Sequence, residues 1–203
     1  MNAVLCFIIS YLVGCIHPAA IIAHIKGFDI RTHGTGNPGG TNAILTMGKK
    51  IGIGVILIDG FKAFFAVRIP LYIWNYSIEI CTMCGICCLI GHVFPFQMRW
   101  KGGKGTASLF GIILGLTPWI FAPVLAALLI IGLYTNNANL LPLITVTAYP
   151  GIFYILKGSL FAVLLLAGLI PLFYWEHRKN LQKHRNGEEK HTFREIMLSD
   201  RHK

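Results

Sequence analysis

Long apolar stretches constrain the fold of this chain more than any other feature. They cover residues 3–25, 51–74, 78–96, 105–133, 140–156 and 159–175 of the 203 residues. A helix of about 20 apolar residues crosses the hydrocarbon core of a bilayer, and the mean hydropathy of the chain is +0.63. The sequence therefore predicts an all-α integral membrane protein, in which residues 1–203 form a single multi-pass membrane domain.

Basic residues are concentrated in a few segments, and their positions predict the orientation in the membrane. They gather in residues 26–50, in the segment after Phe96 and in residues 176–203, and the formal net charge is +10. Because Lys and Arg are enriched in cytoplasmic segments, we predict that all three segments are cytoplasmic, with residues 176–203 as a basic tail. The clustering also indicates anionic ligands or lipids, and we expect no nucleic-acid partner.

The number of helices follows from this orientation. The chain must cross the membrane an even number of times between Lys104 and Glu176, yet it has three apolar runs there. We therefore divide the longest run, residues 105–133, at Pro118, because proline interrupts a helix. The prediction is seven transmembrane helices, with the N-terminus outside and the C-terminus cytoplasmic.

A polar loop, "GTGNPGGTN" at residues 34–42, interrupts this apolar chain. Its glycines allow backbone N–H groups to converge on an anion such as phosphate. Four side chains add further hydrogen-bond donors: Thr35, Asn37, Thr41 and Asn42. A tight turn between helices also favours Gly, Asn and Pro, so both interpretations stay open, and the length of the loop favours the anion site.

A second polar segment, "GHVFPFQMRWKGGKGTAS", places Lys104 among glycines. It does not match the Walker loop, which needs another glycine spacing and a Ser or Thr directly after the lysine. A lysine between glycines can approach a phosphate as a point charge while neighbouring N–H groups bind its oxygens. The alternative is a basic cytoplasmic loop that only sets the orientation.

Two pairs of polar residues are further candidates. Asp59 and Lys62 lie one turn apart inside an apolar run, where charges are costly. We predict that they hold the residues that contact the substrate. The alternative is that the two charges only neutralise each other. His177 and Asn180 are three residues apart, so a helix would place a titratable group and an amide on one face. The sequence contains no legible metal-ligand set, and we expect no metal and no cofactor.

The polar segments, in this order, resemble motifs of the bacterial integral-membrane acyl-phosphate:glycerol-3-phosphate acyltransferase family. The first motif is similar to "DIRTHGTGNPGGTNAILTMG" here, the second to "GHVFPFQMRWKGGKGTA" and the third to "HRKNLQKHRNGEE". The resemblance extends from "SYLVGCIHPAA" near the N-terminus to about Glu189. It implies a seven-helix protein of the bacterial inner membrane, with its active site at the cytoplasmic surface.

The resemblance also implies a reaction and the residues that perform it. The family transfers a fatty acyl group from acyl phosphate to the sn-1 hydroxyl of glycerol 3-phosphate, which gives lysophosphatidic acid and phosphate in the first step of phospholipid synthesis. Carried over by position, the acyl-phosphate site consists of Gly34, Thr35, Gly36, Asn37, Thr41 and Asn42. Lys104, His177 and Asn180 are the implied catalytic residues, and Lys104, His177 and Asn139 the implied ligands of the acceptor phosphate. We expect the protein to act as a monomer in the lipid bilayer.

The sequence departs from the family pattern on the acceptor side. Leu45 stands where the family usually has an arginine, and Asn136, Asn139 and Pro142 stand at the positions of an arginine and two serines. Leucine cannot replace a bidentate arginine contact with phosphate, whereas Asn139 can still donate hydrogen bonds. Two alternatives therefore accompany the orthodox reaction: a diverged paralogue with another acceptor, and a membrane anion or lipid transporter.

Overall fold

The computed structural model describes residues 2–187, and this part of the chain is helical, without strands. The α-helices are α1 (Ala3–Gly14), α2 (Pro18–Ile25), α3 (Gly40–Met47), α4 (Lys49–Ile73), α5 (Ile78–Val93), α6 (Thr106–Leu116), α7 (Pro118–Thr135), α8 (Leu140–Lys157), α9 (Leu160–Ala167) and α10 (Leu169–Arg185). Two 3-10 turns, η1 (Ile30–Thr32) and η2 (Phe96–Met98), lie in the connections. Most of the predicted tail, residues 188–203, is outside the described residues.

Within residues 2–187, five helical stretches are long and apolar enough to cross a membrane. They are Ala3–Ile25, Ile78–Met98, Pro118–Thr135, Leu140–Lys157 and Leu160–Arg185. Two more helices differ from these for separate reasons: α4 has 25 residues but includes Asp59, Lys62 and Arg68, and α6 is apolar but has only 11 residues. The prediction of an all-helical membrane protein is confirmed for the described residues.

The predicted division of the longest apolar run at Pro118 is confirmed as a helix break. Helix α6 ends at Leu116, Thr117 has the non-helical angles φ −141° and ψ 69°, and Pro118 begins α7. The first position of a helix suits proline, because the N–H that proline lacks would have no intrahelical partner there.

The last helix continues beyond its apolar part. The polar tail predicted from Glu176 begins as part of α10, which ends at Arg185, in agreement with the helical spacing of His177 and Asn180. The added turns consist largely of straight-chain residues with good helix propensity. Lys183 and Arg185 lie in the last turn, where the helix dipole favours cations.

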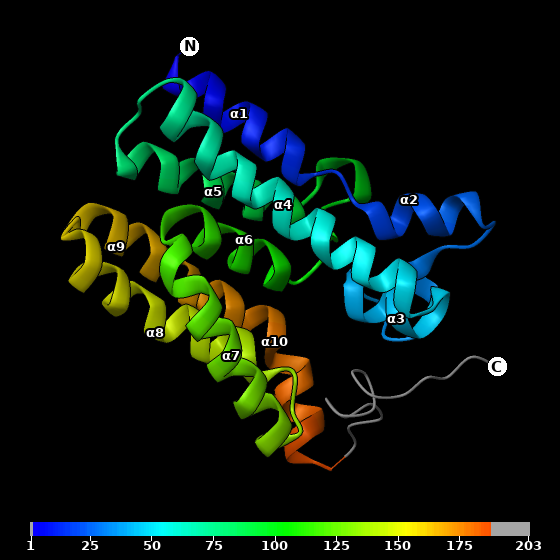
Figure 1. The fold of residues 1–203 in the computed structure, drawn as a ribbon. Helices are drawn as coiled ribbons and strands as arrows, with labels where there is room; N and C mark the ends of the chain where they lie inside the picture. The colour runs from blue at the N-terminus through cyan, green and yellow to red at the C-terminus, as the bar shows by residue number, and fades with distance from the viewer. Residues whose placement is uncertain (1, 188–203) are drawn as a thin grey trace. The chain divides into compact units, whose positions relative to one another are not determined.

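The described chain forms two compact units, residues 2–116 and residues 117–187. In the first unit α1 packs on α5, and α4 packs on α3, α5 and α6 (Figure 1). Glycine allows these helices to approach closely: a Cβ on Gly91 of α5 would overlap the carbonyl oxygen of Tyr11, and a Cβ on Gly111 of α6 would overlap that of Gly60. In the second unit α8 packs against α7, α9 and α10.

Candidate active site

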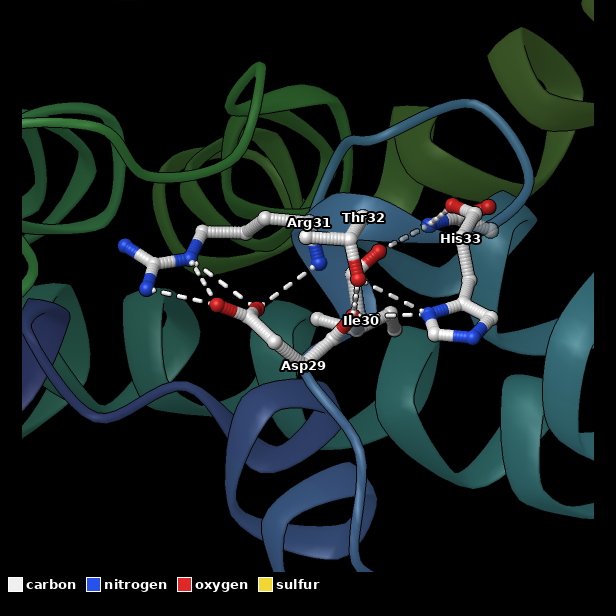
Figure 2. Close-up of polar contacts among 6 residues, drawn as sticks. Asp29, Ile30, Arg31, Thr32 and His33 are labelled. Carbon is white, nitrogen blue, oxygen red and sulfur yellow. Dashed lines mark hydrogen bonds and ion pairs between the residues drawn. The ribbon is translucent and has the colours of Figure 1, made fainter.

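The entrance to the glycine-rich loop is fixed by a compact set of polar contacts around Asp29 (Figure 2). The Asp29 carboxylate accepts from the backbone N–H of Arg31 at 2.9 Å and pairs with the Arg31 guanidinium at 2.8 Å. Its backbone carbonyl accepts from the Thr32 hydroxyl at 2.9 Å and contacts His33 Nδ1 at 3.0 Å. The hydrogen bonds from Arg31 lower the pKa of Asp29 to about 2, and these same hydrogen bonds hold the η1 turn.

Inside the loop, Asn42 holds the backbone in shape. Its side-chain oxygen accepts from the backbone N–H of Thr35 at 2.7 Å, and its amide nitrogen donates to the carbonyls of Ile30 and His33 at 3.0 Å each. Gly34 adopts φ 57°, and a Cβ there would overlap the Asn42 side chain. Asn42 is fully buried, so its side chain contributes to the loop as a support from inside.

The other predicted loop residues lie on the open side. Thr35, Gly36 and Thr41 are exposed, and Asn37 is half-buried. The loop runs into the N-terminus of α3, where Gly39 is the cap residue and provides no side-chain hydrogen bond. The first N–H groups of a helix lack intrahelical acceptors and carry the positive end of its dipole. This end of the loop is therefore suited to an anion.

The glycines before Lys104 serve a different purpose from the one we predicted. The N–H groups of Gly102 and Gly103 donate to the carbonyls of Val93 and His92, each at 3.0 Å, and are thus already paired within the protein. A Cβ on Gly103 would overlap the His92 ring. These glycines allow the segment to lie flat on the end of α5, and Lys104, which is half-buried, follows directly.

A buried polar cluster lies behind both segments and includes the predicted supporting pair. Lys62 Nζ is 2.8 Å from Asp59 Oδ1 and 3.0 Å from His92 Nδ1, and His92 Nδ1 is 3.4 Å from the same carboxylate oxygen. The His17 ring stacks on the His92 ring, with centroids 4.7 Å apart. The exposed fractions are 2% for His17, 1% for Asp59, 8% for Lys62 and 3% for His92.

Sequence reasoning missed both histidines of this cluster. Each stands in an apolar run beside a helix end, in "CIHP" and "GHVFP". A histidine in an apolar run is a signal for a buried polar partner. The partner itself is contributed by α4 and could be identified only from the fold.

In the second unit, the structure fixes the orientation of the His177 ring. The residue is buried on α10, its ring stacks on Phe173, and Nδ1 lies 2.9 Å from the Phe173 carbonyl oxygen. A carbonyl only accepts, so Nδ1 carries a proton. In the neutral ring, Nε2 is then the nitrogen with a lone pair, which is the arrangement that a proton acceptor needs.

The structure brings together two more of the predicted residues, Asn180 and Asn139. The Asn180 amide nitrogen donates to the side-chain oxygen of Asn139, which precedes α8. The backbone N–H of Asn139 donates in turn to the side-chain oxygen of Asn137 at 2.8 Å. Asn137 is fully buried, and its amide nitrogen has no partner among the described residues. We had not predicted a role for Asn137 from the sequence.

Two residues that depart from the family pattern lie in helices α3 and α8. Leu45 is half-buried in α3, and Pro142 is buried in the first turn of α8.

A groove of about 990 Å³ lies along α2 and the η1 turn, lined mainly by apolar side chains and also by Asp29 and Arg31. Among residues 2–187 no group of three or more His, Cys, Asp or Glu side chains is placed to hold a metal ion.

The fold and the site define a class: an integral membrane protein with a glycine-rich loop that suits an anion in front of a helix N-terminus. The chain belongs to the glycerol-3-phosphate acyltransferase family, which it matches over residues 4–187. The resemblance seen in the sequence is thereby confirmed.

Individual relatives agree over nearly their whole length. The glycerol-3-phosphate acyltransferase of Coxiella burnetii (strain Dugway 5J108-111) is 34% identical over 193 residues, which cover 93% of this chain and 97% of the relative. The Aquifex aeolicus (strain VF5) enzyme of the same name is 32% identical over 194 residues, covering 95% and 100%. A crystal structure of PlsY (YgiH), an integral membrane glycerol 3-phosphate acyltransferase in its glycerol 3-phosphate form, is similar with a TM-score of 0.88 and 26% identity, covering 97% of this chain and 99% of that one.

Proposed function

We propose that this protein transfers a fatty acyl group from acyl phosphate to the sn-1 hydroxyl of glycerol 3-phosphate. The products are lysophosphatidic acid and inorganic phosphate, and the reaction is the first step of phospholipid synthesis. The observation that carries this proposal is the family match over residues 4–187. The crystal structures of the similar PlsY in glycerol 3-phosphate and lysophosphatidic acid forms support the same acceptor and product.

The glycine-rich loop is the proposed site for the phosphate of the acyl donor. Its residues are Gly34, Thr35, Gly36, Asn37, Thr41 and Asn42. Thr35 and Thr41, which are exposed, offer hydroxyl donors, and backbone N–H groups at the start of α3 bind phosphate oxygens. Asn42 acts from inside by fixing the backbone that presents these groups. The largely apolar groove along α2 supports binding of a fatty acyl chain next to this loop.

Lys104, His177, Asn139 and Asn180 are the proposed residues for the acceptor and for the transfer. The acceptor hydroxyl oxygen attacks the carbonyl carbon of acyl phosphate, a new ester bond forms, and the bond from that carbon to the phosphate oxygen breaks. The hydroxyl proton passes to a phosphate oxygen or to Nε2 of His177. Lys104 balances phosphate charge and loop N–H groups stabilise the departing phosphate. Acyl phosphate is already activated, so no covalent enzyme intermediate is required.

We further propose that the chain crosses the bacterial inner membrane seven times. The five candidate spans, together with the long helix α4 and the short helix α6, supply this number. The distribution of basic residues supports an orientation in which the N-terminus lies outside the cytoplasm and the tail at residues 176–203 lies inside it. In this orientation the active site faces the cytoplasm. In this proposal the chain is one multi-pass membrane domain and acts as a monomer.

The test is release of inorganic phosphate by the purified, detergent-solubilised protein given palmitoyl phosphate, with and without glycerol 3-phosphate. Acceptor-dependent release that is lost in Lys104→Ala and retained in Lys101→Ala is expected. Lys101 is an exposed lysine in the same segment and controls for loss of positive charge alone. Absence of release from the unmodified protein would contradict the proposal and favour the transporter alternative.

A second candidate is the same chemistry with a different hydroxyl-bearing acceptor. Leu45 and Pro142, two of the residues that depart from the family pattern, cannot donate a side-chain hydrogen bond to a phosphate. Asn139 can, and the buried Asn137 lies next to it. If phosphate release from palmitoyl phosphate does not respond to glycerol 3-phosphate but responds to glycerol or to another polyol, this second candidate is the correct one.

A further inference from the structure

We propose that His92 is a positioning residue that holds the Lys104 segment and the glycine-rich loop in one fixed arrangement. It acts together with Asp59, Lys62 and His17. The inference rests on the acyltransferase function proposed above, and it assigns a functional role to four buried side chains that do not themselves need to touch a substrate.

Lys62 provides the hydrogen-bond donor for carbonyl groups at the break between α1 and α2. Pro18 has no N–H, so the carbonyl of Gly14, four residues earlier, cannot form its usual helical hydrogen bond. Lys62 Nζ donates to this carbonyl at 3.0 Å and to the carbonyl of Ile16 at 2.8 Å. The ammonium group of α4 thereby fixes the position of the chain between α1 and α2.

The second step concerns Asp59, which compensates the buried charge. Its carboxylate lies 2.8 Å from Lys62 Nζ as an ion pair. A buried ammonium without a carboxylate would be strongly unfavourable, since charges in an apolar interior need a partner. The backbone carbonyl of Asp59 also accepts from the Ser108 hydroxyl at 3.3 Å. Ser108 lies on α6, the helix that begins just after Lys104, so the backbone of Asp59 also contacts the helix that follows this segment.

The third step concerns His92, which touches the cluster and the Lys104 segment at once. Its Nδ1 faces Lys62 and Asp59, and one ring face stacks on His17. Its opposite edge lies against Gly103, because a Cβ on Gly103 would collide with Nε2. The His92 carbonyl accepts the N–H of the same glycine. A shift of the His92 ring therefore moves the residue directly before Lys104.

The fourth step connects the cluster to the glycine-rich loop. The buried ring of His17 lies near the backbone of Pro38, in the middle of that loop. Pro38 itself is buried, as is the His17 ring, which is 2% exposed. His17 therefore lies close both to the backbone of the loop and to the His92 ring, on which it stacks.

The two phosphate-binding segments are thus linked through a continuous set of buried contacts within the first unit. Transfer between two bound substrates requires their reacting atoms to lie within bonding approach, and a misplacement of about 1 Å reduces the rate by about 100-fold. A cluster that fixes both segments should contribute to the rate in this way, without contributing a group to the chemistry.

The test compares His92→Ala and His92→Asn with Lys101→Ala as the control. Lys101 is exposed in the same segment as Gly103, so its replacement truncates a side chain of this segment without disturbing the cluster. Each variant is purified in detergent as a monodisperse fraction, and kcat and KM for palmitoyl phosphate and for glycerol 3-phosphate are measured per folded molecule. The expected result is a loss of about 100-fold in kcat/KM for His92→Ala, a smaller loss for His92→Asn, which keeps a polar atom near Nδ1, and no change for Lys101→Ala.

A double-mutant cycle with Gly103→Ala separates positioning from general stability. The added Cβ collides with the His92 ring, so Gly103→Ala should impair turnover in the unmodified background. With His92→Ala the collision is removed, and the second substitution should add little to the first. If His92 has only a structural role, the substitutions should lower the thermal midpoint and the yield, and their effects on stability should add. The kinetic constants of the folded fraction should then stay unchanged.

Each outcome decides the question. Unchanged constants for folded His92→Ala overturn the inference while the proposed function stands. If His92→Ala does not fold, His92→Asn and Gly103→Ala decide instead, since Gly103→Ala removes none of the four buried side chains and only displaces the His92 ring. Unchanged constants in both variants overturn the inference. If neither the unmodified protein nor Lys101→Ala releases phosphate, the proposed function has failed, and the positioning role falls with it.

Discussion

Replacement of Lys62 by methionine should destabilise the protein strongly, because it removes only one partner of a buried ion pair. Methionine has nearly the length of lysine and no charge, so packing of the aliphatic chain on α4 is retained. Asp59, which is 1% exposed, loses its compensating charge. The carbonyls of Gly14 and Ile16 lose the donor that replaces their helical hydrogen bonds.

The magnitude follows from these three losses. Breaking a buried pair by removing one partner costs about 3–5 kcal/mol, and a buried carbonyl left unpaired costs about 1–3 kcal/mol. The contributions overlap because the same ammonium serves all three acceptors, so we expect a total of about 5 kcal/mol. For chains of this size the thermal midpoint moves by about 2–4 °C per kcal/mol, so Tm should fall by roughly 10–20 °C.

The assay is thermal unfolding of the detergent-purified protein, followed by intrinsic tryptophan fluorescence. Lys101→Met, at an exposed lysine, is the control and should leave Tm unchanged. The double variant Asp59→Asn/Lys62→Met removes both charges, so it should recover a large part of the loss and be more stable than Lys62→Met alone. A double variant as unstable as the sum of both single variants would refute the reasoning, because it would mean that the two charges do not compensate each other.

Three further predictions concern other parts of the first unit. Asn42→Ala removes three hydrogen bonds inside the glycine-rich loop and should raise KM for palmitoyl phosphate about tenfold or more, whereas an unchanged KM would mean that the loop holds its shape without this side chain. Gly91→Ala should lower stability by about 1–3 kcal/mol because the helices α1 and α5 meet there, while Gly54→Ala, which meets nothing within 4 Å, should be neutral in the same unfolding assay. The pKa of Asp29 is lowered from 3.8 to about 2 by Arg31, so its contribution to stability is present above pH 3.8 and is lost as the pH falls towards 2. Asp29→Asn should therefore lower Tm slightly at neutral pH, and the difference from the unmodified protein should vanish in that acidic range.

The sequence predicts most of the helices, because bilayer-length apolar runs and prolines are local signals. Pro118 marked a helix break that the structure confirms. The end of α10 was predicted only in part: the spacing of His177 and Asn180 indicated a helix there, but no local signal placed its end at Arg185. Hydropathy reports where a helix could be buried in lipid, and it does not report where the helical backbone ends.

For the candidate site, the sequence predicts where the polar loop lies but not what each of its residues does. Composition alone identifies the glycine-rich loop, because few other roles need so many glycines and amides together. Composition cannot distinguish a residue that contacts a ligand from one that holds the loop in shape. Asn42 is an example, because only the fold shows that its side chain is turned inward. Gly102 and Gly103 are a second example, since their N–H groups are paired with the end of α5. Contacts between distant segments decide both cases.

The order of causes in the first unit explains why these glycines and histidines occur together. Pro18 breaks the first apolar helix and leaves carbonyl oxygens without their helical donors, and a membrane interior does not tolerate such groups unpaired. The ammonium of Lys62 satisfies them, which in turn requires the carboxylate of Asp59 beside it. His92 fills the remaining polar face of this pair, and the chain that passes over its ring must then be glycine at position 103. The glycine motif before Lys104 is therefore a packing consequence of a helix broken many residues earlier, as well as a neighbour of the proposed phosphate-binding lysine.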